Sequence, residues 1–244
     1  MACISTAWIT PKNIKSFTTT RKGGVSKPPF DSFNIAYHVN DNPNDILTNR
    51  ALLHEQLPCS AVWLEQIHSN KVIEVNSKTD LNIVEQADAL FTKEKNIPLA
   101  IMTADCLPIL LTDEKGSQIA AIHGGWRGLA GGIINNTVAC FDCNPSDIKA
   151  WLGPAIGPER FEVGQDVIDA FSKLNINHLL GFKPQKNGKF LADIFVLAQQ
   201  LLIQLGISHI SSEQRCTYDD PELFYSYRRD NQTGRMASLI WIEN

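Results

Sequence analysis

Cys106 and His123 are the residues whose types and spacing first suggest chemistry in this chain. They lie at the outer ends of two apolar runs, 107–111 and 119–122, and the polar, glycine-containing segment 112–117 separates these runs. Short apolar runs around such a break are typical of a β-hairpin. A hairpin would bring the thiol and the imidazole together, where they could share a metal ion or act as nucleophile and base.

The register of this hairpin decides how close the two groups lie. If Thr112 pairs with Ser117 across a four-residue loop, counting back along both strands places Cys106 opposite His123. Directly opposed residues have Cβ atoms about 5 Å apart. Pro108, inside the first run, favours an edge strand or a strand start. Cys106 taken alone could equally be a small buried hydrophobic residue.

A glycine-rich turn, 124–128 (GGWRG), follows His123, and apolar residues recur at helical spacing from Leu129 to Phe141. A strand, a glycine turn and a helix start together expose backbone N–H groups to an anion. Arg127 would add a forked set of donors suited to phosphate. The alternative is that the glycines only permit a tight turn.

Length and composition restrict the class of protein. The chain has 244 residues, of which 43% are hydrophobic, and a formal net charge of −4. One sizeable core is possible at this length, so we predict a single domain spanning residues 1–244. The sequence contains no dense Lys/Arg run, secretion signal or apolar stretch of membrane-spanning length. We therefore expect a cytoplasmic protein without nucleic-acid or membrane partners, whose six cysteines are reduced thiols.

The apolar pattern also predicts the elements that must position these residues. It indicates helices over 45–57 and 193–205 and a second hairpin over 61–75, in which His68 directly precedes the turn at Ser69-Asn70. Strands and helices mix without strict βαβ alternation, and both hairpins are local. This favours the α+β class, with one domain built on a mixed, largely antiparallel sheet and helices packed on it.

His68, Cys106 and His123 each stand at a predicted strand end beside a turn. One cysteine and two histidines form a ligand set that catalytic zinc uses, with water in the fourth position. From spacing alone the third ligand stays open among the six histidines. Three ligands argue against a purely structural zinc ion, which normally has four protein ligands.

Several motifs, in order, resemble the laccase-domain family of YfiH-like proteins. They are TTRKGG, SFN followed by HV, EQIHSN, TADCLPIL, HGGWRG and the tail SYRRD followed by TGR, and the match runs from about residue 17 to the C-terminus. Members are variously described as purine nucleoside phosphorylases, peptidoglycan editing factors and polyphenol oxidases. The resemblance implies a fold shared with proteins regarded as cysteine hydrolases, and it implies that His68, Cys106 and His123 bind one zinc ion per chain.

The resemblance further implies phosphorolysis of adenosine, inosine and methylthioadenosine, with adenosine deamination as an accompanying activity and nucleoside and phosphate as partners. Zinc with an open position lowers the pKa of bound water to about 7, which provides hydroxide for attack on purine C6. Asp105 or Glu162 could carry the proton, although Asp105 could equally be a turn residue. The candidate catalytic residues are thus Cys106, His123 and Asp105.

Phosphorolysis also needs a phosphate ion beside the anomeric carbon and stabilised charge as the glycosidic bond breaks. Arg21, Arg50 and Arg127 are candidates for this phosphate clamp. Asn34 and His38 lie in a long polar loop, a common place for function, and are candidate substrate contacts. Each of these five could instead be an ordinary surface or hydrogen-bonded residue.

Two other activities would use the same ligands. A hydrolase that edits a UDP-linked muropeptide of the cell wall could use zinc hydroxide or the Cys106–His123 pair to cleave an amide. A copper polyphenol oxidase could add Met102 as an axial ligand. Multicopper oxidation needs several centres and about ten histidines by usual ligand counting, and the chain has six. Both a monomer and a homodimer are compatible with the sequence.

Overall fold

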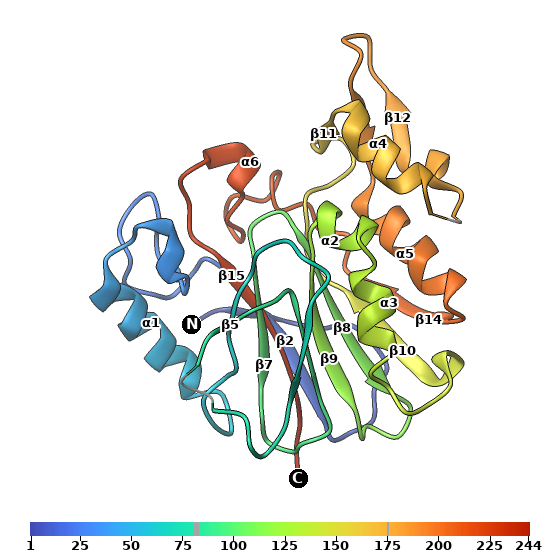
Figure 1. Cartoon of the computed structure of the whole chain (residues 1–244). Coiled ribbons are helices and arrows are strands. Elements are labelled where there is room, and N and C mark those ends of the chain that lie inside the picture. The colour runs from blue at the N-terminus through green and yellow to red at the C-terminus, as the bar shows by residue number, and fades with distance from the viewer. Residues whose placement is uncertain (81–82, 175) are drawn as a thin grey trace.

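Two β-sheets that face each other form the centre of the molecule, and helices cover both outer faces (Figure 1). The computed structural model describes residues 1–80, 83–174 and 176–244. Within these ranges, no helix is both long enough and apolar enough to cross a membrane.

The larger sheet consists, in spatial order, of β14 (His209–Ser212), β10 (Ile148–Leu152), β8 (Leu107–Asp113), β9 (Ile119–Gly124), β6 (Ala89–Thr92) and β4 (Val72–Val75). The smaller consists of β1 (Cys3–Ser5), β2 (Ile14–Thr19), β15 (Met236–Ile242) and β7 (Leu99–Thr103). Strands β10 and β14 pair in parallel, as do β4 and β6, and the other neighbours in both sheets are antiparallel. This confirms the predicted α+β class and the largely antiparallel pairing, with the strands divided between two sheets.

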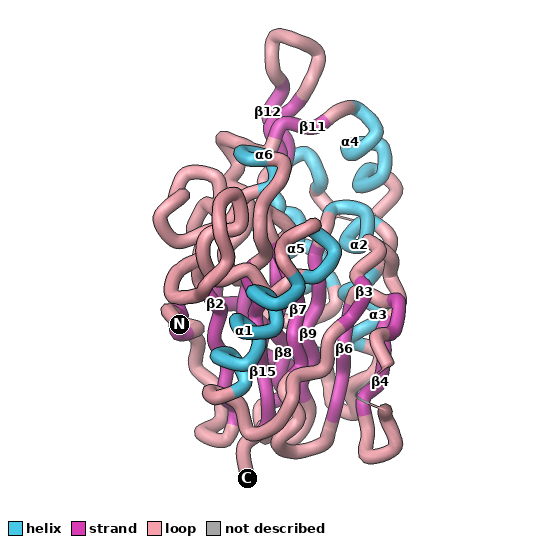
Figure 2. Tube along the Cα trace, turned by 90° about the vertical axis from the view of Figure 1, so that its left-hand side faces the viewer, coloured by secondary structure: helices cyan, strands magenta, loops and turns pink. Residues whose placement is uncertain are grey.

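Helices and short strands complete the layers. The α-helices are α1 (Pro43–His54), α2 (Trp126–Ala130), α3 (Ile133–Val138), α4 (Gln165–Ser172), α5 (Ile194–Gln204) and α6 (Tyr227–Asp230). Short 3-10 helices occur at Tyr37–Val39, Pro145–Asp147 and His178–Gly181. The remaining strands are β11 (Glu162–Val163), β13 (Phe190–Ala192) and β12 (Phe182–Pro184) in one small antiparallel sheet, and β3 (Leu64–Glu65) with β5 (Glu85–Gln86) in a parallel pair. Figure 2 shows α1 crossing in front of β7 and β15.

Alternation of side chains along the strands holds the layers together. In β7, Leu99 and Ile101 enter the core between the two sheets, whereas Ala100 and Met102 face the layer that contains α1. Leu110 of β8 enters the same inter-sheet core, and the neighbouring side chains of β8 face the layer of α2 to α5. Strands β7 and β8 are thus apolar on both faces.

The central hairpin forms, but its predicted register is wrong by two residues. Thr112 pairs with Ile119, and Pro108 rather than Cys106 lies opposite His123. The reason is Asp113, whose carboxylate accepts hydrogen bonds from backbone N–H groups of the turn and so moves the turn one residue further along the first strand. A shift of two keeps every side chain on its predicted face, because the strand repeat is two.

Two other predictions also need correction. The segment 61–75 is not a hairpin, because β3 pairs with β5 and β4 pairs with β6. The helix predicted from residue 129 divides into α2 and α3, because Gly132 adopts φ +87° between them. The helix predicted over 193–205 is confirmed as α5, and Asp193 caps it by accepting from two backbone N–H groups.

Candidate metal centre

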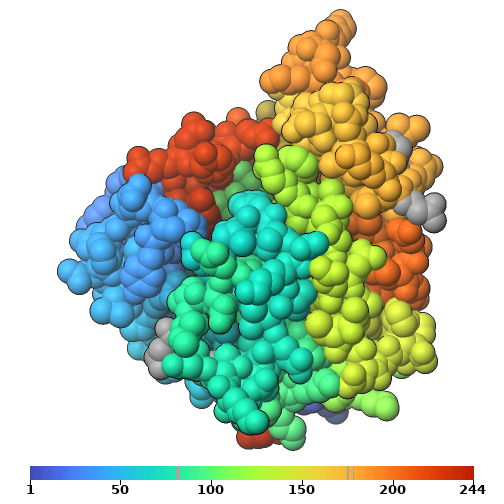
Figure 3. Space-filling view, viewed as in Figure 1, coloured from blue at the N-terminus to red at the C-terminus, as the bar shows by residue number. Residues whose placement is uncertain are grey.

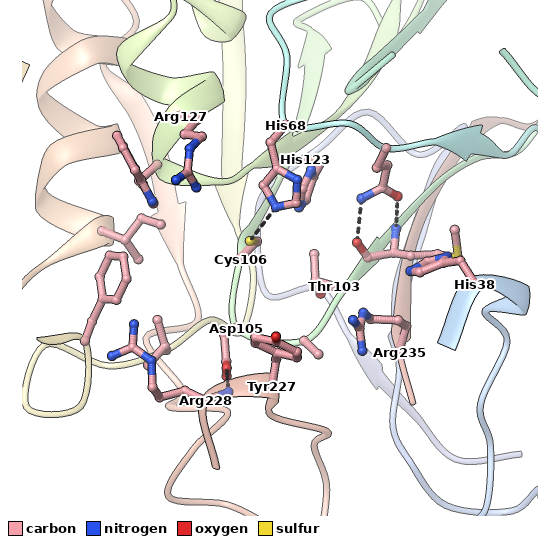
Figure 4. A pocket seen from close by; sticks show the side chains of 17 residues that line it. His38, His68, Thr103, Asp105, Cys106, His123, Arg127, Tyr227, Arg228 and Arg235 are labelled. Carbon is pink, nitrogen blue, oxygen red and sulfur yellow. Dashed lines mark hydrogen bonds between the residues drawn. The ribbon is translucent and has the colours of Figure 1, made fainter. Parts of the chain in front are cut away.

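His68, Cys106 and His123 come from three separate segments and meet at one end of the sheets. Their ligand atoms all lie within 4.8 Å of one another, and Cys106 Sγ is 3.9 Å from His68 Nε2 (Figure 4). The two imidazole rings are close to perpendicular, with centroids 4.8 Å apart. Within the described ranges, this is the single group of three or more His, Cys, Asp or Glu side chains close enough to hold one ion. The structure therefore brings the three predicted ligands together.

Asp88 holds two of these groups in place. Its buried carboxylate accepts hydrogen bonds from His123 Nδ1 at 2.8 Å, from the backbone N–H of His68 at 2.9 Å and from both the N–H and the hydroxyl of Ser69. Burial alone would raise the pKa of Asp88, but the hydrogen bonds from His123 and Ser69 lower it to about 2. Because the ionised carboxylate only accepts, Nδ1 of His123 carries a hydrogen, and Nε2 is the atom that can bind a metal.

Gly125 has no side chain, and the side chains of His68 and Cys106 occupy the space that one would fill. A Cβ atom at this position would lie 2.9 Å from Cδ2 of His68 and 3.4 Å from Sγ of Cys106. Any larger residue would push the imidazole away from the thiol. One thiol and two imidazoles form a donor set that zinc binds, and three protein ligands leave a position for water or substrate. The residues present therefore fit a catalytic zinc ion.

The metal-free ligands form a charged pair. Burial alone would raise the pKa of Cys106, but the positive charge of His123 and hydrogen bonds from both imidazoles lower it to about 6. Burial alone would lower the pKa of His123, but the Cys106 thiolate and Asp88 raise it to about 9. Thiolate and imidazolium therefore coexist at neutral pH, and a metal ion that binds must displace the imidazolium proton.

The rate of thiol alkylation measures the ionisation of Cys106 directly. In metal-free protein we expect the rate of Cys106 alkylation by iodoacetamide to rise with pH around a midpoint near 6, because the thiolate is the reactive form. Cys140, whose pKa burial raises above the ordinary thiol value, should react only at higher pH than Cys106. Mass spectrometry across a pH series separates the two, and zinc should protect Cys106 alone. A Cys106 midpoint near the ordinary thiol value of about 8.5 would contradict the thiolate assignment.

A cavity of about 450 Å³ lies beside the three ligands. Figure 3 shows the surface recessed where the red segment that carries α6 meets the cyan and yellow-green segments. The end of β7, the residues before β8, and helices α2 and α6 contribute side chains to its wall. The ligand set is therefore open to a molecule in this cavity.

One side of the cavity is polar. Arg235 lies here with His38, and the Arg235 guanidinium donates from Nη1 to the carbonyls of Thr233 and Gly234. Burial lowers the pKa of His38, and the positive charges of Arg235 and Arg50 lower it further. Its ring is therefore uncharged at neutral pH. The hydroxyl of Thr103 is buried in the wall and has no hydrogen-bond partner within the described part of the chain. This side offers a cation and an unpaired hydroxyl to a ligand.

The opposite side is apolar and aromatic. Ile156, Phe161 and Ile194 belong to one buried cluster, and Trp126 packs against it. A flat, weakly polar ligand would bury apolar surface against this wall.

Two further arginines frame the apolar wall. The guanidinium of Arg127 lies 4.3 Å from the Trp126 ring centroid, and that of Arg228 lies 5.5 Å from the Phe161 ring centroid. Figure 4 shows Arg127 and Arg228 on one side of the ligand set, with His38 and Arg235 on the other. The cavity therefore presents cations at two separate places.

Asp105 lies in the cavity wall next to Cys106. It adopts φ +95°, and its two carboxylate oxygens accept hydrogen bonds from the Thr217 hydroxyl and from the backbone N–H of Arg228, both at 2.6 Å. Both oxygens are thus occupied by bonds that join three segments of chain. Glu162 lies outside the lining, where it pairs with Lys189 at 2.7 Å.

Of the five residues predicted to contact substrate or phosphate, His38 and Arg127 line the cavity. Arg50 is stacked between the rings of Tyr37 and Trp63 outside the lining. Arg21 pairs with Asp31 in a second surface depression.

Asn34 is fully buried and lies behind the cavity rather than in its lining. It accepts from the backbone N–H of Arg235 and donates to Asp41. It therefore supports the two loops that carry His38 and Arg235, and its direct contact with substrate stays a prediction.

Sequence reasoning missed Asp88, Thr103, Arg228 and Arg235 as cavity or supporting residues. The last two lie in the SYRRD and TGR motifs, so the resemblance carried a signal for them. Thr103 begins the TADCLPIL motif and so carried the same signal. Asp88 lies in none of these motifs, and its position depends on which strands become neighbours.

Known proteins resemble this chain over its whole length. The family described as multi-copper polyphenol oxidoreductase laccase matches residues 15–243. A Haemophilus influenzae protein named purine nucleoside phosphorylase is 47% identical over 247 residues, with 100% of both chains covered. The Escherichia coli protein named purine nucleoside phosphorylase YfiH is 45% identical over 237 residues, with 96% of each covered.

Solved structures also resemble this chain over nearly its whole length. The crystal structure of a Neisseria meningitidis protein superposes with a TM-score of 0.95 at 42% identity and covers 100% of both chains. YlmD from Geobacillus stearothermophilus gives a TM-score of 0.90 at 32% identity, with 96% of this chain and 93% of that chain covered. The chain therefore belongs to the laccase-domain family of YfiH-like proteins, as its motifs indicate.

Proposed function

We propose that this chain is a zinc-dependent purine nucleoside phosphorylase acting on adenosine, inosine and methylthioadenosine. The names of relatives at 42–47% identity support the reaction class. The observation that carries the proposal is the His68–Cys106–His123 group in the wall of a cavity with one apolar and one polar, cationic side. A purine base suits the first surface and a phosphate ion suits the second.

In this proposal the residues of the polar side hold the phosphate ion. Arg235 supplies the positive charge, the Thr103 hydroxyl donates its free hydrogen, and the uncharged ring of His38 exchanges a proton with the phosphate. His68, Cys106 and His123 would hold zinc, which when bound supplies a Lewis acid and lowers the pKa of water. Asp88 keeps the His123 ring in the orientation that this requires.

Adenosine deamination is proposed as a second activity of the same cavity. It replaces the 6-amino group with oxygen from water and needs a group that moves a proton. Asp105 could act only if one of its two hydrogen bonds opened, and Glu162 would have to leave Lys189.

The test uses zinc-loaded protein with each nucleoside, with and without phosphate. We expect base release that depends on phosphate and is matched by an equal amount of the sugar 1-phosphate, and we expect chelation of zinc to stop it. Conversion of adenosine to inosine should occur without phosphate. Base release no faster than in a protein-free control would overturn the phosphorylase proposal.

One observation favours a second candidate function. The site has the three groups that cysteine hydrolases use: Cys106 as the nucleophile, His123 as the base, and Asp88 as the carboxylate that orients the base. Such an enzyme would cleave the amide of a UDP-linked muropeptide without metal and would stop on alkylation of Cys106. Cleavage by metal-free protein favours this hydrolase, whereas activity only with zinc and phosphate favours the phosphorylase.

Zinc is preferred to copper because the one three-ligand group found among the described residues cannot form the several centres of a multicopper oxidase. Metal analysis that finds several copper ions per chain would reverse this choice. The six free cysteines support the proposed cytoplasmic location. A monomer and a homodimer both suit the proposal, since every residue that it uses belongs to one chain.

A further inference from the structure

Arg127 differs from the other arginines of the cavity in having no polar partner. Arg228 and Arg235 each donate to two backbone carbonyls, whereas the Arg127 guanidinium makes no hydrogen bond or ion pair with any described residue. Its contact is the Trp126 ring, which lies 4.3 Å from it. All five of its N–H donors are therefore free at the edge of the aromatic wall.

We propose that the wall formed by Trp126 and Phe161 binds the purine base and that Arg127 donates to N7 and O6 of that base. This inference rests on the proposed phosphorylase function. Aromatic rings bind a base by stacking, which contributes about 1–3 kcal/mol per base. A guanidinium matches the N7 and O6 acceptor pair of a 6-oxopurine with two parallel hydrogen bonds.

The two-sided cavity agrees with the direction of the reaction. A phosphate ion that displaces a base attacks the sugar from the face opposite the base. Arg127 lies across the ligand set from His38 and Arg235, as Figure 4 shows. The phosphate and the base would then occupy the polar and the aromatic side respectively.

Arg127 would also assist the chemical step. A phosphate oxygen forms the new bond to the anomeric carbon, the bond from this carbon to N9 breaks, and its electron pair passes to the purine. The negative charge spreads to N7 and O6, and the proton of hydrogen phosphate ends on the base. Nucleoside and hydrogen phosphate thus give free base and sugar 1-phosphate. A cation at N7 and O6 binds the departing purine more strongly than the neutral nucleoside.

Arg127 thereby becomes a specificity-determining residue. Adenine presents a 6-amino donor in place of O6, so only N7 can accept from Arg127. Arg127→Ala should therefore lower kcat/KM for inosine about 100-fold and for adenosine about tenfold, because a lost donor to developing charge typically costs about 10²-fold or more.

The experiment measures phosphorolysis of inosine and adenosine by zinc-loaded wild type, Arg127→Ala and Arg127→Gln. The control is Arg160→Ala, since Arg160 is also exposed but pairs with Asp219 outside the cavity lining. We expect the inosine-to-adenosine ratio of kcat/KM to fall about tenfold in both Arg127 variants and to stay unchanged in the control. An unchanged ratio in both Arg127 variants, or an equal fall in the control, would overturn the inference.

Calorimetric binding of hypoxanthine and adenine tests the inference independently of turnover. Hypoxanthine should bind Arg127→Ala about tenfold more weakly than wild type, and adenine should be affected less. If the wild type forms no sugar 1-phosphate but shows this difference, the phosphorylase proposal fails and the base site stands. If the wild type is active and hypoxanthine binds both proteins equally, the base site fails and the phosphorylase proposal stands.

Discussion

Cys106→Ser should abolish phosphorolysis and zinc binding while leaving the metal-free protein folded. Sγ of Cys106 is one of three ligand atoms within 4.8 Å of one another, and the side chain lies in the cavity wall rather than in a packed core. Metal catalysis supplies several kcal/mol of transition-state stabilisation, so kcat/KM should fall by at least about 10³-fold. Kinetics measure phosphorolysis, metal analysis measures zinc binding, and thermal melting shows whether the metal-free proteins are folded.

Cys59→Ser is the matched control, because Cys59 donates to the carbonyl of Asn96 far from the cavity lining. It should keep full zinc content and activity. If metal-free Cys106→Ser unfolds, or melts far below the metal-free wild type, the site is a structural staple and the catalytic account is wrong. Full activity in Cys106→Ser would contradict it as well.

Asp88→Ala should weaken zinc binding and destabilise the fold together. Its carboxylate accepts from the His123 ring, from the hydroxyl of Ser69 and from the backbone N–H groups of residues 67–69. Loss of such a partner typically lowers metal affinity about 10–100-fold. Removing one member of a buried charged pair costs about 3–5 kcal/mol, since its donors stay buried without an acceptor. Zinc titration and denaturant unfolding of the metal-free protein measure the two effects.

Asp113→Ala separates these effects, because Asp113 is also buried and caps the β8–β9 turn through Ser117 and Gln118. This variant should lose stability but keep the zinc affinity of the wild type. Asp88→Asn should keep part of the stability and still bind zinc more weakly, because the amide replaces the charge that orients His123. Equal zinc affinity in Asp88→Ala and wild type would contradict the role assigned to Asp88.

The ligand set could be predicted because its signals are local or lie in motifs. Cys106 and His123 lie at the two ends of one hairpin. The two-residue error in its predicted register did not change the predicted ligands, because both side chains stay on the same face of the sheet. His68 was found through its motif, and the hairpin expected around it does not exist. Its backbone instead turns at φ +59° and donates to Asp88.

The remaining residues depend on long-range pairing that periodicity does not specify. Asp88 meets His123 because β6 joins β9, and an alternating apolar pattern says nothing about strand order. The apolar pattern also does not show how the strands divide between two sheets. Leu99 and Ala100 both look like core residues in the sequence, although they face different layers. Arg21 and Arg50 fit a phosphate clamp by type, and their role there stays a prediction. In the structure, both contact aromatic rings and backbone carbonyls away from the cavity lining.

Anomalous scattering at the zinc edge, from a crystal of zinc-loaded protein with inosine, tests the account most directly. We predict one peak per chain, about 2.0–2.1 Å from a ring nitrogen of each of His68 and His123 and about 2.3 Å from Sγ of Cys106. The hypoxanthine base should lie against Trp126 in the same map. No anomalous density among these three side chains at full zinc occupancy, or inosine bound in another part of the molecule, would contradict the account.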